Sequence, residues 1–297
     1  MERISFHDEI KRNKIKSGFL LVGIIIMFIV LGYIISLATN PGYFFIIMII
    51  SIIFSLLYVW FGYYYSDKIA LSTVKAVKAD RAHHSQLINS VESMALASGL
   101  PTPRVYVMNS DQINAFASGR DPKNAVICVT TGALRKLNKQ ELEGVIAHEM
   151  AHIANYDIRF ITIATVLVGL ISIVGEIFLR SLWFSSSDRD NKNVLFMILA
   201  IVLAILAPIV ASLVSLSISR KREFAADATG VKFTRYPVGL KNALLKIKDD
   251  HLGEIDKKRY AKSMAPLFIS DPFKKKVKNM FSTHPDIDER IQKLNRM

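Results

Sequence analysis

The chain has 297 residues, of which 51% are hydrophobic, and 38 Lys and Arg residues against 25 Asp and Glu residues give a formal net charge of +13. This hydrophobic content excludes an intrinsically disordered chain, because disorder requires low hydrophobicity together with high net charge. The single cysteine, Cys128, excludes an internal disulfide framework and a cysteine-based metal cage. A positive mean hydropathy beside such a charge indicates that apolar and basic residues are segregated along the chain.

Two long uncharged stretches near the N-terminus predict a pair of membrane-spanning helices. Residues 18–38 and 43–65 contain no Asp, Glu, Lys or Arg, and residues 39–42 between them are rich in turn-forming Asn, Pro and Gly. Each stretch is long enough to cross a hydrocarbon core of about 30 Å as a helix. The alternative for the first stretch, a secretory signal peptide, fits less well, because the stretch is too long and lacks an Ala-x-Ala cleavage site.

A second pair of apolar stretches, at residues 158–182 and 194–218, brings the expected number of spans to four. Glu176 and Arg180 in the first of them stand four residues apart, so they share one helix face. We interpret them as an ion pair near the outer interface, and the alternative is a functional site inside the membrane. Pro208 in the last stretch predicts a kink, because membrane helices tolerate proline.

The distribution of positive charge predicts the orientation of these spans. Residues 1–16 carry five Lys and Arg residues, whereas the loop between the first two spans carries none, so the N-terminus is expected in the cytoplasm. With four spans, the C-terminus lies there too. We therefore divide the chain into an N-terminal tail and hairpin, a first cytoplasmic segment, a second membrane pair and a second cytoplasmic segment, at residues 1–65, 66–157, 158–218 and 219–297.

The first cytoplasmic segment mixes helical and extended patterns. Residues 68–96 have helical periodicity, and residues 104–108 and 125–130 are short β-branched runs with a turn signal between them. We expect the two runs to pair in a small antiparallel sheet. The 125–130 strand has two open interpretations: an edge strand that binds an extended peptide by strand addition, or an internal strand of the sheet.

The most informative motif lies on the next helix. Asn138 with Glu141 three residues later forms a capping-box pattern at its start, and residues 148–152 read His-Glu-Met-Ala-His. Two histidines four apart on a helix face the same way and can reach one zinc ion, with bonds of about 2.0–2.1 Å. The glutamate beside the first histidine is placed to activate a water molecule. The alternative is a pair of satisfied surface histidines on an amphipathic helix.

A third ligand is available directly after the last apolar stretch. Glu223 and Asp227 stand one helical turn apart, in the sequence Ser-Arg-Lys-Arg-Glu-Phe-Ala-Ala-Asp. Glu223 can complete a three-ligand catalytic site, and Asp227 can accept the other ring N–H of a ligating histidine and fix its tautomer. Alone this pair would be a weak signal. Its position strengthens it, because it directly follows the fourth span at its cytoplasmic end, just as the His-Glu-x-x-His motif directly precedes the third span at its cytoplasmic end.

These motifs together resemble the HtpX family of membrane-embedded zinc metalloproteases. The resemblance covers the hairpin, H-E-x-x-H, two further spans, S-R-x-x-E-x-x-A-D and a terminal Ser-Thr-His-Pro at residues 282–285. It implies a multi-span α-helical membrane protein with a mainly α, α+β, zincin-like cytoplasmic catalytic domain. The family pattern implies one Zn²⁺ per chain held by His148, His152 and Glu223, with Asp227 hydrogen-bonded to a ligating histidine. It implies Glu149 as the catalytic base. His284 and Asn114 are candidate donors to the oxyanion of the transition state.

The resemblance also implies a function. We expect a zinc metalloendopeptidase of the inner or plasma membrane that cleaves damaged or misfolded membrane proteins at the cytoplasmic face, in quality control and stress response. The alternative is a proteolytically inactive zinc-containing scaffold or adaptor. Expected partners are protein or peptide substrates and the lipid bilayer, not nucleic acid, because the basic clusters at residues 257–259 and 274–276 carry no nucleic-acid motif. His83 and His84 are expected to be solvated, and Cys128 to be buried.

Overall fold

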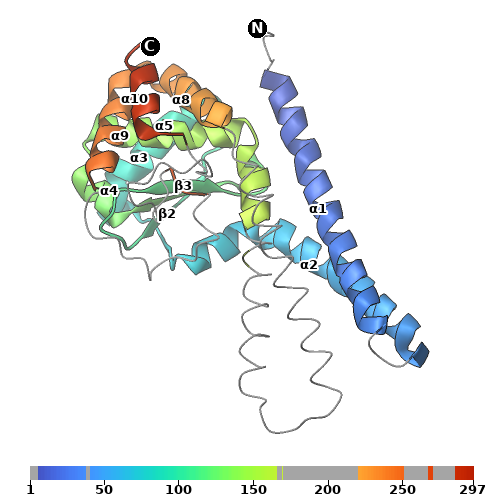
Figure 1. Ribbon diagram of the computed structural model, residues 1–297. Coiled ribbons are helices and arrows are strands. Elements are labelled where there is room, and N and C mark those ends of the chain that lie inside the picture. The colour runs from blue at the N-terminus through green and yellow to red at the C-terminus, as the bar shows by residue number, and fades with distance from the viewer. Residues whose placement is uncertain (1–5, 38–40, 166–168, 170–219, 251–266, 270–284) are drawn as a thin grey trace.

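A computed structural model describes residues 6–37, 41–165, 169, 220–250, 267–269 and 285–297 (Figure 1). Several predictions made above lie outside the described residues: most of the third span, with Glu176 and Arg180, the fourth span with Pro208, the basic clusters at 257–259 and 274–276, and His284.

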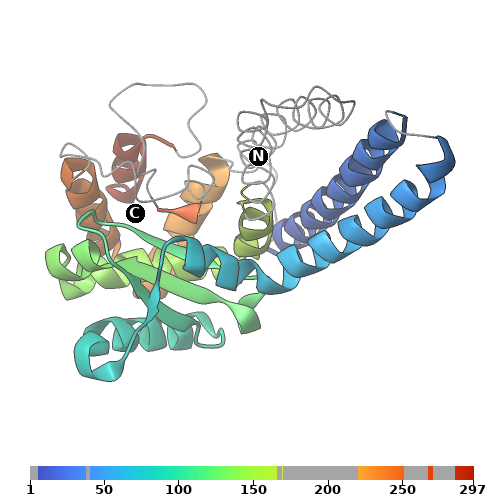
Figure 2. The ribbon, with the colours of Figure 1, turned by 90° about the horizontal axis from the view of Figure 1, so that it is seen from below.

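The N-terminal hairpin consists of two long helices, α1 (Phe6–Leu37) and α2 (Phe44–Thr73), joined through the short 3-10 helix η1 (Pro41–Tyr43). They pack against each other and project from one side of the remaining structure (Figures 1 and 2). Both helices are long and apolar enough to cross a membrane. Large apolar side chains on them are exposed, among them Phe19 at 74% and Phe45 at 76%. Exposed apolar surface of this extent is typical of helices that contact lipid.

The predicted helical region at residues 68–96 is interrupted at residues 74–80. Helix α2 continues to Thr73, the chain turns through Lys75 at a φ of 51°, and strand β1 (Val77–Lys78) follows. A new helix, α3 (Arg81–Ser98), begins after Asp80, whose carboxylate accepts a hydrogen bond from the backbone N–H of His83. The helical periodicity therefore belongs to two helices, and the Asp80 cap marks the start of the second.

The sheet contains β1, β2 (Arg104–Met108), β3 (Ala115–Ser118) and β4 (Val126–Thr130) in the order β1-β2-β4-β3. Strands β2 and β4 are parallel, so the predicted antiparallel pairing of these two runs is wrong. The segment between them contributes β3, which pairs antiparallel with β4 and reverses the chain once more. Strand β4 is therefore an internal strand of the sheet and not an edge strand that could bind a peptide by strand addition. Strand β3 lies at the edge.

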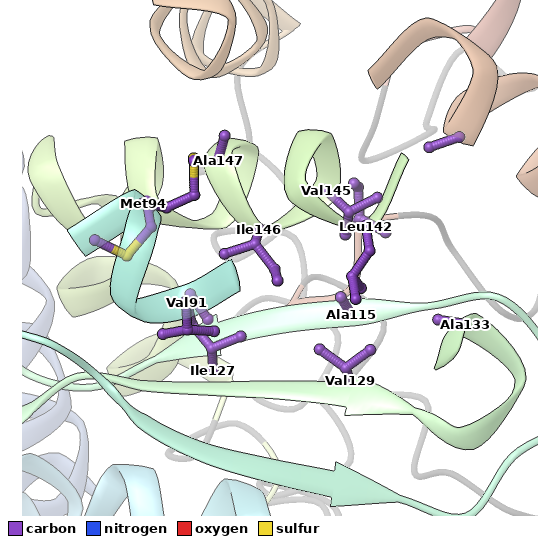
Figure 3. Close-up of a cluster of buried hydrophobic side chains, with 14 of the residues drawn as sticks. Val91, Met94, Ala115, Ile127, Val129, Ala133, Leu142, Val145, Ile146 and Ala147 are labelled. Carbon is purple, nitrogen blue, oxygen red and sulfur yellow. The ribbon is translucent and has the colours of Figure 1, made fainter. Parts of the chain in front are cut away.

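Helices cover both faces of this sheet. On one face, α3 and α5 (Lys139–Ala154) pack on β3 and β4 around a dry core (Figure 3), whose members include Val91, Met94, Ala115, Ile127, Val129, Leu142, Val145 and Ile146. On the other face, the end of α2 packs against side chains that include Phe116 and Cys128. Cys128 is fully buried, so that prediction is confirmed.

The second polar segment packs on the far side of α5. It provides α8 (Arg220–Thr234), α9 (Pro237–Asp250) and the C-terminal α10 (Ile287–Leu294), while the short α4 (Thr131–Lys136) follows β4. Glycine allows close approach at Gly230 of α8, where a Cβ would lie 3.0 Å from the backbone nitrogen of His148. Helix α5 is therefore enclosed between the sheet and α8, and its central residues are buried.

Candidate metal centre and active site

Helix α5 is fixed at its start by the predicted capping box. The side chain of Asn138 accepts a hydrogen bond from the backbone N–H of Glu141, and the carboxylate of Glu141 accepts one from the backbone N–H of Asn138. Lys246 of α9 pairs with the same carboxylate at 2.7 Å. The start of the helix is thus satisfied internally and tied to α9, which sets the rotation of α5 and the direction of the residues that follow.

His148, His152 and Glu223 come together between α5 and α8. The Nε2 atoms of the two histidines lie 3.2 Å apart, and the Glu223 carboxylate lies 3.7 Å from His148 Nε2 and 3.6 Å from His152 Nε2. One ligand atom from each residue falls within 4.8 Å of the others, and all three side chains are buried. Two imidazoles and one carboxylate form a donor set found at catalytic zinc sites. The three predicted ligands therefore form one cluster that could hold a metal ion.

Asp227 lies directly behind His148, as the one-turn spacing from Glu223 predicts. Its Oδ1 is 2.9 Å from His148 Nδ1, so the Nε2 of this histidine points to the cluster. Burial and the positive charge of Arg290 lower the pKa of His148 to about 4, although the hydrogen bond with Asp227 opposes them. The imidazole is therefore neutral near pH 7, which is the form that binds a metal.

A buried arginine completes this side of the cluster and was not predicted. Arg290 of α10 is 1% exposed and donates two hydrogen bonds to Asp227, from Nε at 2.9 Å and from Nη2 at 2.6 Å. Burial raises the pKa of Asp227, but the charge of Arg290 and hydrogen bonds from His148 and Arg290 lower it to about 2. An arginine 63 residues beyond its partner carries no local signal of burial, so only the tertiary structure reveals this pair.

Asp157 plays the corresponding part behind His152 and was also not predicted. Its Oδ2 lies 3.0 Å from His152 Nδ1. The chain reaches this position through a sharp turn after α5, where Tyr156 has a φ of 58°. Burial lowers the pKa of His152, but the hydrogen bond with Asp157 and the charge of Glu223 raise it to about 9.

Asp157 is itself held by two segments distant in the sequence. Asn13 of α1 donates from Nδ2 to Asp157 Oδ1 at 2.8 Å and to the backbone carbonyl of Asn155 at 3.1 Å. Arg222 of α8 places its Nε 3.0 Å from the same Asp157 oxygen and donates to Asn13 Oδ1 at 3.2 Å. A hydrogen-bonded chain therefore connects the first membrane helix to a candidate metal ligand.

Glu149 has one carboxylate oxygen held and one free of hydrogen bonds among the described residues. Its Oε2 accepts a hydrogen bond from the backbone N–H of Ala117 in β3 at 2.8 Å, whereas Oε1 is buried without a partner. Burial raises the pKa of Glu149 to about 7, with Glu223 adding to this effect and His152 opposing it. A buried oxygen left unpaired beside three candidate ligands fits a site that accommodates a metal ion and water.

The site surrounds a cavity of about 20 Å³, lined by His148, Glu149, His152 and Glu223 and by apolar residues. This volume accommodates little more than one water molecule or one ion. Residues 267–269 cover it: Ile269 donates a backbone hydrogen bond to Ala115 of the edge strand at 2.9 Å, and Phe268 packs edge-on against Phe116. Residues 267–269 therefore form part of the wall of this cavity, beside the edge strand.

The family model for peptidase family M48 matches residues 81–297, which include the H-E-x-x-H helix, α8 and α10. The chain belongs to this family. It is 45% identical to a protease HtpX homolog of Caldanaerobacter subterraneus subsp. tengcongensis over 284 residues, which cover 90% of this chain and 92% of that relative. It is 40% identical over 297 residues to a protease HtpX homolog of Dictyoglomus thermophilum, with 100% of this chain and 96% of that relative covered.

A solved structure is also similar to the chain. The crystal structure of S. mikatae Ste24p matches with a TM-score of 0.49 and 20% sequence identity. The match covers 95% of this chain and 65% of that chain, so the present chain spans about two thirds of its length.

Membership of M48 supports a metalloprotease, and the similarity to proteins named protease HtpX homolog confirms the resemblance to HtpX proteases. The family is zinc-dependent, and the His148, His152 and Glu223 cluster is the candidate metal site in the described part of this chain. The inactive-scaffold alternative is not favoured by these relatives, which are named as proteases.

Of the two candidate oxyanion donors, Asn114 lies among the described residues and His284 lies outside them. Asn114 is buried at the start of β3, where its Oδ1 accepts a hydrogen bond from the backbone N–H of Ala115 at 3.0 Å. It is not among the described residues that line the 20 Å³ cavity. The sequence Asn-Ala-Phe-Ala at residues 114–117 does reach the site, because the backbone N–H of Ala117 donates a hydrogen bond to Glu149. The oxyanion roles of Asn114 and His284 stay predictions.

Proposed function

We propose that this M48 protease is a zinc endopeptidase that hydrolyses peptide bonds in damaged or misfolded membrane proteins at the cytoplasmic face of the cell membrane. The observation that carries the proposal is the meeting of His148, His152 and Glu223 beside an unpaired oxygen of Glu149 in one buried cavity. Two imidazoles and a carboxylate leave a fourth position for water or substrate, as catalytic zinc sites do.

A bound zinc ion would supply Lewis-acid polarisation of the scissile carbonyl and of a water molecule. Glu149 is proposed as the general base: its Oε1 accepts a proton from the attacking water and then delivers it to the departing amine. The backbone N–H of Ala117 fixes the other oxygen, so the carboxylate keeps one orientation through both transfers. Burial of Glu149 raises its pKa, which favours uptake of a proton from water.

The residues behind the histidines set which ring nitrogen is available. Asp227 and Asp157 each lie against an Nδ1 atom, at 2.9 Å and 3.0 Å, and so direct both Nε2 atoms into the cluster. Such carboxylates orient metal-binding histidines and raise their basicity. We therefore propose that these two carboxylates prepare the site for metal, and that Asn114 and His284 donate to the oxyanion.

The topology of four spans, with both termini and the site in the cytoplasm, belongs to the same proposal. It is supported by the apolar helices α1 and α2 and by the positive charge concentrated before residue 17. The domain division at residues 65, 157 and 218 follows from it, with the segments before and after the second membrane pair building one catalytic unit.

The direct test is proteolysis by the full-length chain, purified in detergent with zinc and incubated with an unfolded protein such as casein. We expect the Glu149→Gln variant to bind zinc but to lose about 10²- to 10⁴-fold in kcat, because its amide cannot accept a proton. Glu143→Gln, on the outer part of the same helix, is the matched control and should cleave like the wild type. Equal cleavage by Glu149→Gln would contradict Glu149 as the general base, and no cleavage by the zinc-loaded wild type would overturn the proposal in favour of an inactive scaffold.

A further inference from the structure

A second, much larger cavity lies between α1 and the catalytic part of the chain. Its volume is about 950 Å³, and none of its lining residues is shared with the metal site. Four cationic side chains line it: Lys14 of α1, Lys123 after β3, Arg159 after α5 and Lys232 of α8. Leu100 and Phe233 are among its apolar lining residues, so the cavity combines positive charge with apolar surface.

The positive charge of this cavity is not neutralised within the described part of the chain. Asp121 is the one acidic lining residue there, and its carboxylate already accepts hydrogen bonds from the backbone and side chain of Asn124. None of the four cations forms an ion pair with a described carboxylate, and Arg159 Nε is buried without a hydrogen-bond partner. Four like charges around one cavity repel each other, and an anionic ligand would remove that cost.

The cavity lies at the level where the apolar helices meet the polar part of the molecule. Lys14 follows Asn13, the first residue of the apolar segment of α1, and its Nζ lies 4.5 Å from the ring centroid of Tyr156. Arg159 hydrogen-bonds to the hydroxyl of Tyr63, near the polar end of α2, and its guanidinium lies 5.4 Å from that ring centroid. Tyrosine and snorkelling cations are typical of the headgroup layer of a membrane.

We propose that this cavity binds the phosphate headgroup of an anionic phospholipid. Lys14 and Arg159 meet the phosphate at the membrane edge of the cavity, and Lys123 and Lys232 attract it from the catalytic side. The acyl chains lie against the exposed apolar face of α1, where Phe19 and Val22 are 74% and 53% exposed. Exposed apolar side chains on the helix that carries Lys14 favour a lipid over a free anion. The proposal depends on insertion of the chain in a membrane but not on proteolysis.

The test measures lipid binding to the full-length protein in neutral detergent by native mass spectrometry. Short-chain phosphatidylglycerol is titrated against phosphatidylcholine with the same acyl chains. Each cation near a membrane surface strengthens binding of anionic lipid about fivefold, so the K123Q/K232Q variant should bind phosphatidylglycerol about 25-fold more weakly than the wild type. K139Q/K241Q removes the same charge from α5 and α9, outside the cavity, and should bind like the wild type.

The variant K123R/K232R is a control for effects on folding, because it changes the same two positions but keeps their charge. It should bind phosphatidylglycerol like the wild type. Equal weakening by K123Q/K232Q and K139Q/K241Q would overturn the proposal, since the effect would then be general charge attraction. Equal binding of the two lipids would show an apolar groove without headgroup selectivity and would overturn it too. Binding of glycerol 1-phosphate as tight as that of the lipid would show a site for free anions and would contradict the lipid assignment.

Discussion

The carboxylate that Arg290 pairs with lies 63 residues away in the sequence, yet Arg290 is fully buried beside the candidate active site. Its guanidinium binds both oxygens of Asp227, and its Nη1 donates to the backbone carbonyl of Ile269 at 3.3 Å. A guanidinium matches a carboxylate with two parallel hydrogen bonds, which a lysine cannot do. Arg290 therefore joins the carboxylate behind His148 to the segment that covers the cavity.

Removal of Arg290 should affect both stability and metal binding. Arg290→Met leaves the Asp227 carboxylate buried without its cation, which typically costs about 3–5 kcal/mol of the free energy of unfolding. Arg290→Lys keeps the charge but loses the paired geometry, so its melting temperature should lie between those of Arg290→Met and the wild type. Zinc affinity, measured by chelator competition, should fall in the same order. Arg296→Met, on the exposed C-terminus, is the control, and a wild-type melting temperature for Arg290→Met would contradict this role.

The sequence predicts the residues of this site that follow a local rule. His148, His152, Glu223 and Asp227 are recognisable because one-turn spacing on a helix brings side chains to one face. Arg290, Asp157 and Asn13 are not recognisable, because each reaches the site from a segment whose position depends on the packing of the whole chain. Charged residues are rarely buried, so the sequence favours an exposed position for both Arg290 and Asp157.

Helix α1 shows that a membrane element and the metal site are parts of one hydrogen-bonded structure. Asn13 contacts Asp157 directly, and Asp157 in turn orients His152. A change in the position of α1 therefore changes the support of a candidate ligand. This link is independent of Arg290, which supports the other histidine.

Asn13→Ala should weaken zinc binding by the full-length protein, because Asp157 loses one of its donors. Partners behind metal ligands commonly contribute about 10- to 100-fold in metal affinity or activity, and Arg222 retains part of the support, so we expect a loss near the lower figure. Ser17→Ala is the matched control one turn along α1, since within the described part of the chain this hydroxyl donates to the backbone carbonyl of Asn13 and not to Asp157. The link is refuted when chelator competition gives Asn13→Ala and Ser17→Ala the same zinc affinity.

Strand pairing was the least predictable feature at the level of elements. The runs at residues 104–108 and 125–130 were correctly identified as strands, but their direction depends on β3 between them. Four residues of β3, Ala-Phe-Ala-Ser, lack a strong β pattern, so the additional reversal was missed. By contrast, the capping box of α5 was predicted to the residue, because all of its hydrogen bonds lie within four residues.

At the scale of the whole molecule, the high hydrophobicity and the net charge of +13 are explained by different parts of the structure. Among the described residues, exposed large apolar side chains are concentrated on α1 and α2, and the described catalytic part has its own buried core. Part of the positive charge surrounds the 950 Å³ cavity beside α1. The hairpin follows from hydropathy alone, whereas the relation between α1, the cavity and the metal site depends on tertiary packing that no local pattern encodes.

The central claim, that His148, His152 and Glu223 hold one catalytic zinc ion, is tested most directly by zinc-edge X-ray absorption on the zinc-loaded full-length protein. We predict one zinc per chain with two imidazole nitrogens and carboxylate or water oxygens bound to it, at about 2.0–2.2 Å. Sulfur among the bound atoms, or a number of imidazoles other than two, would contradict the claim.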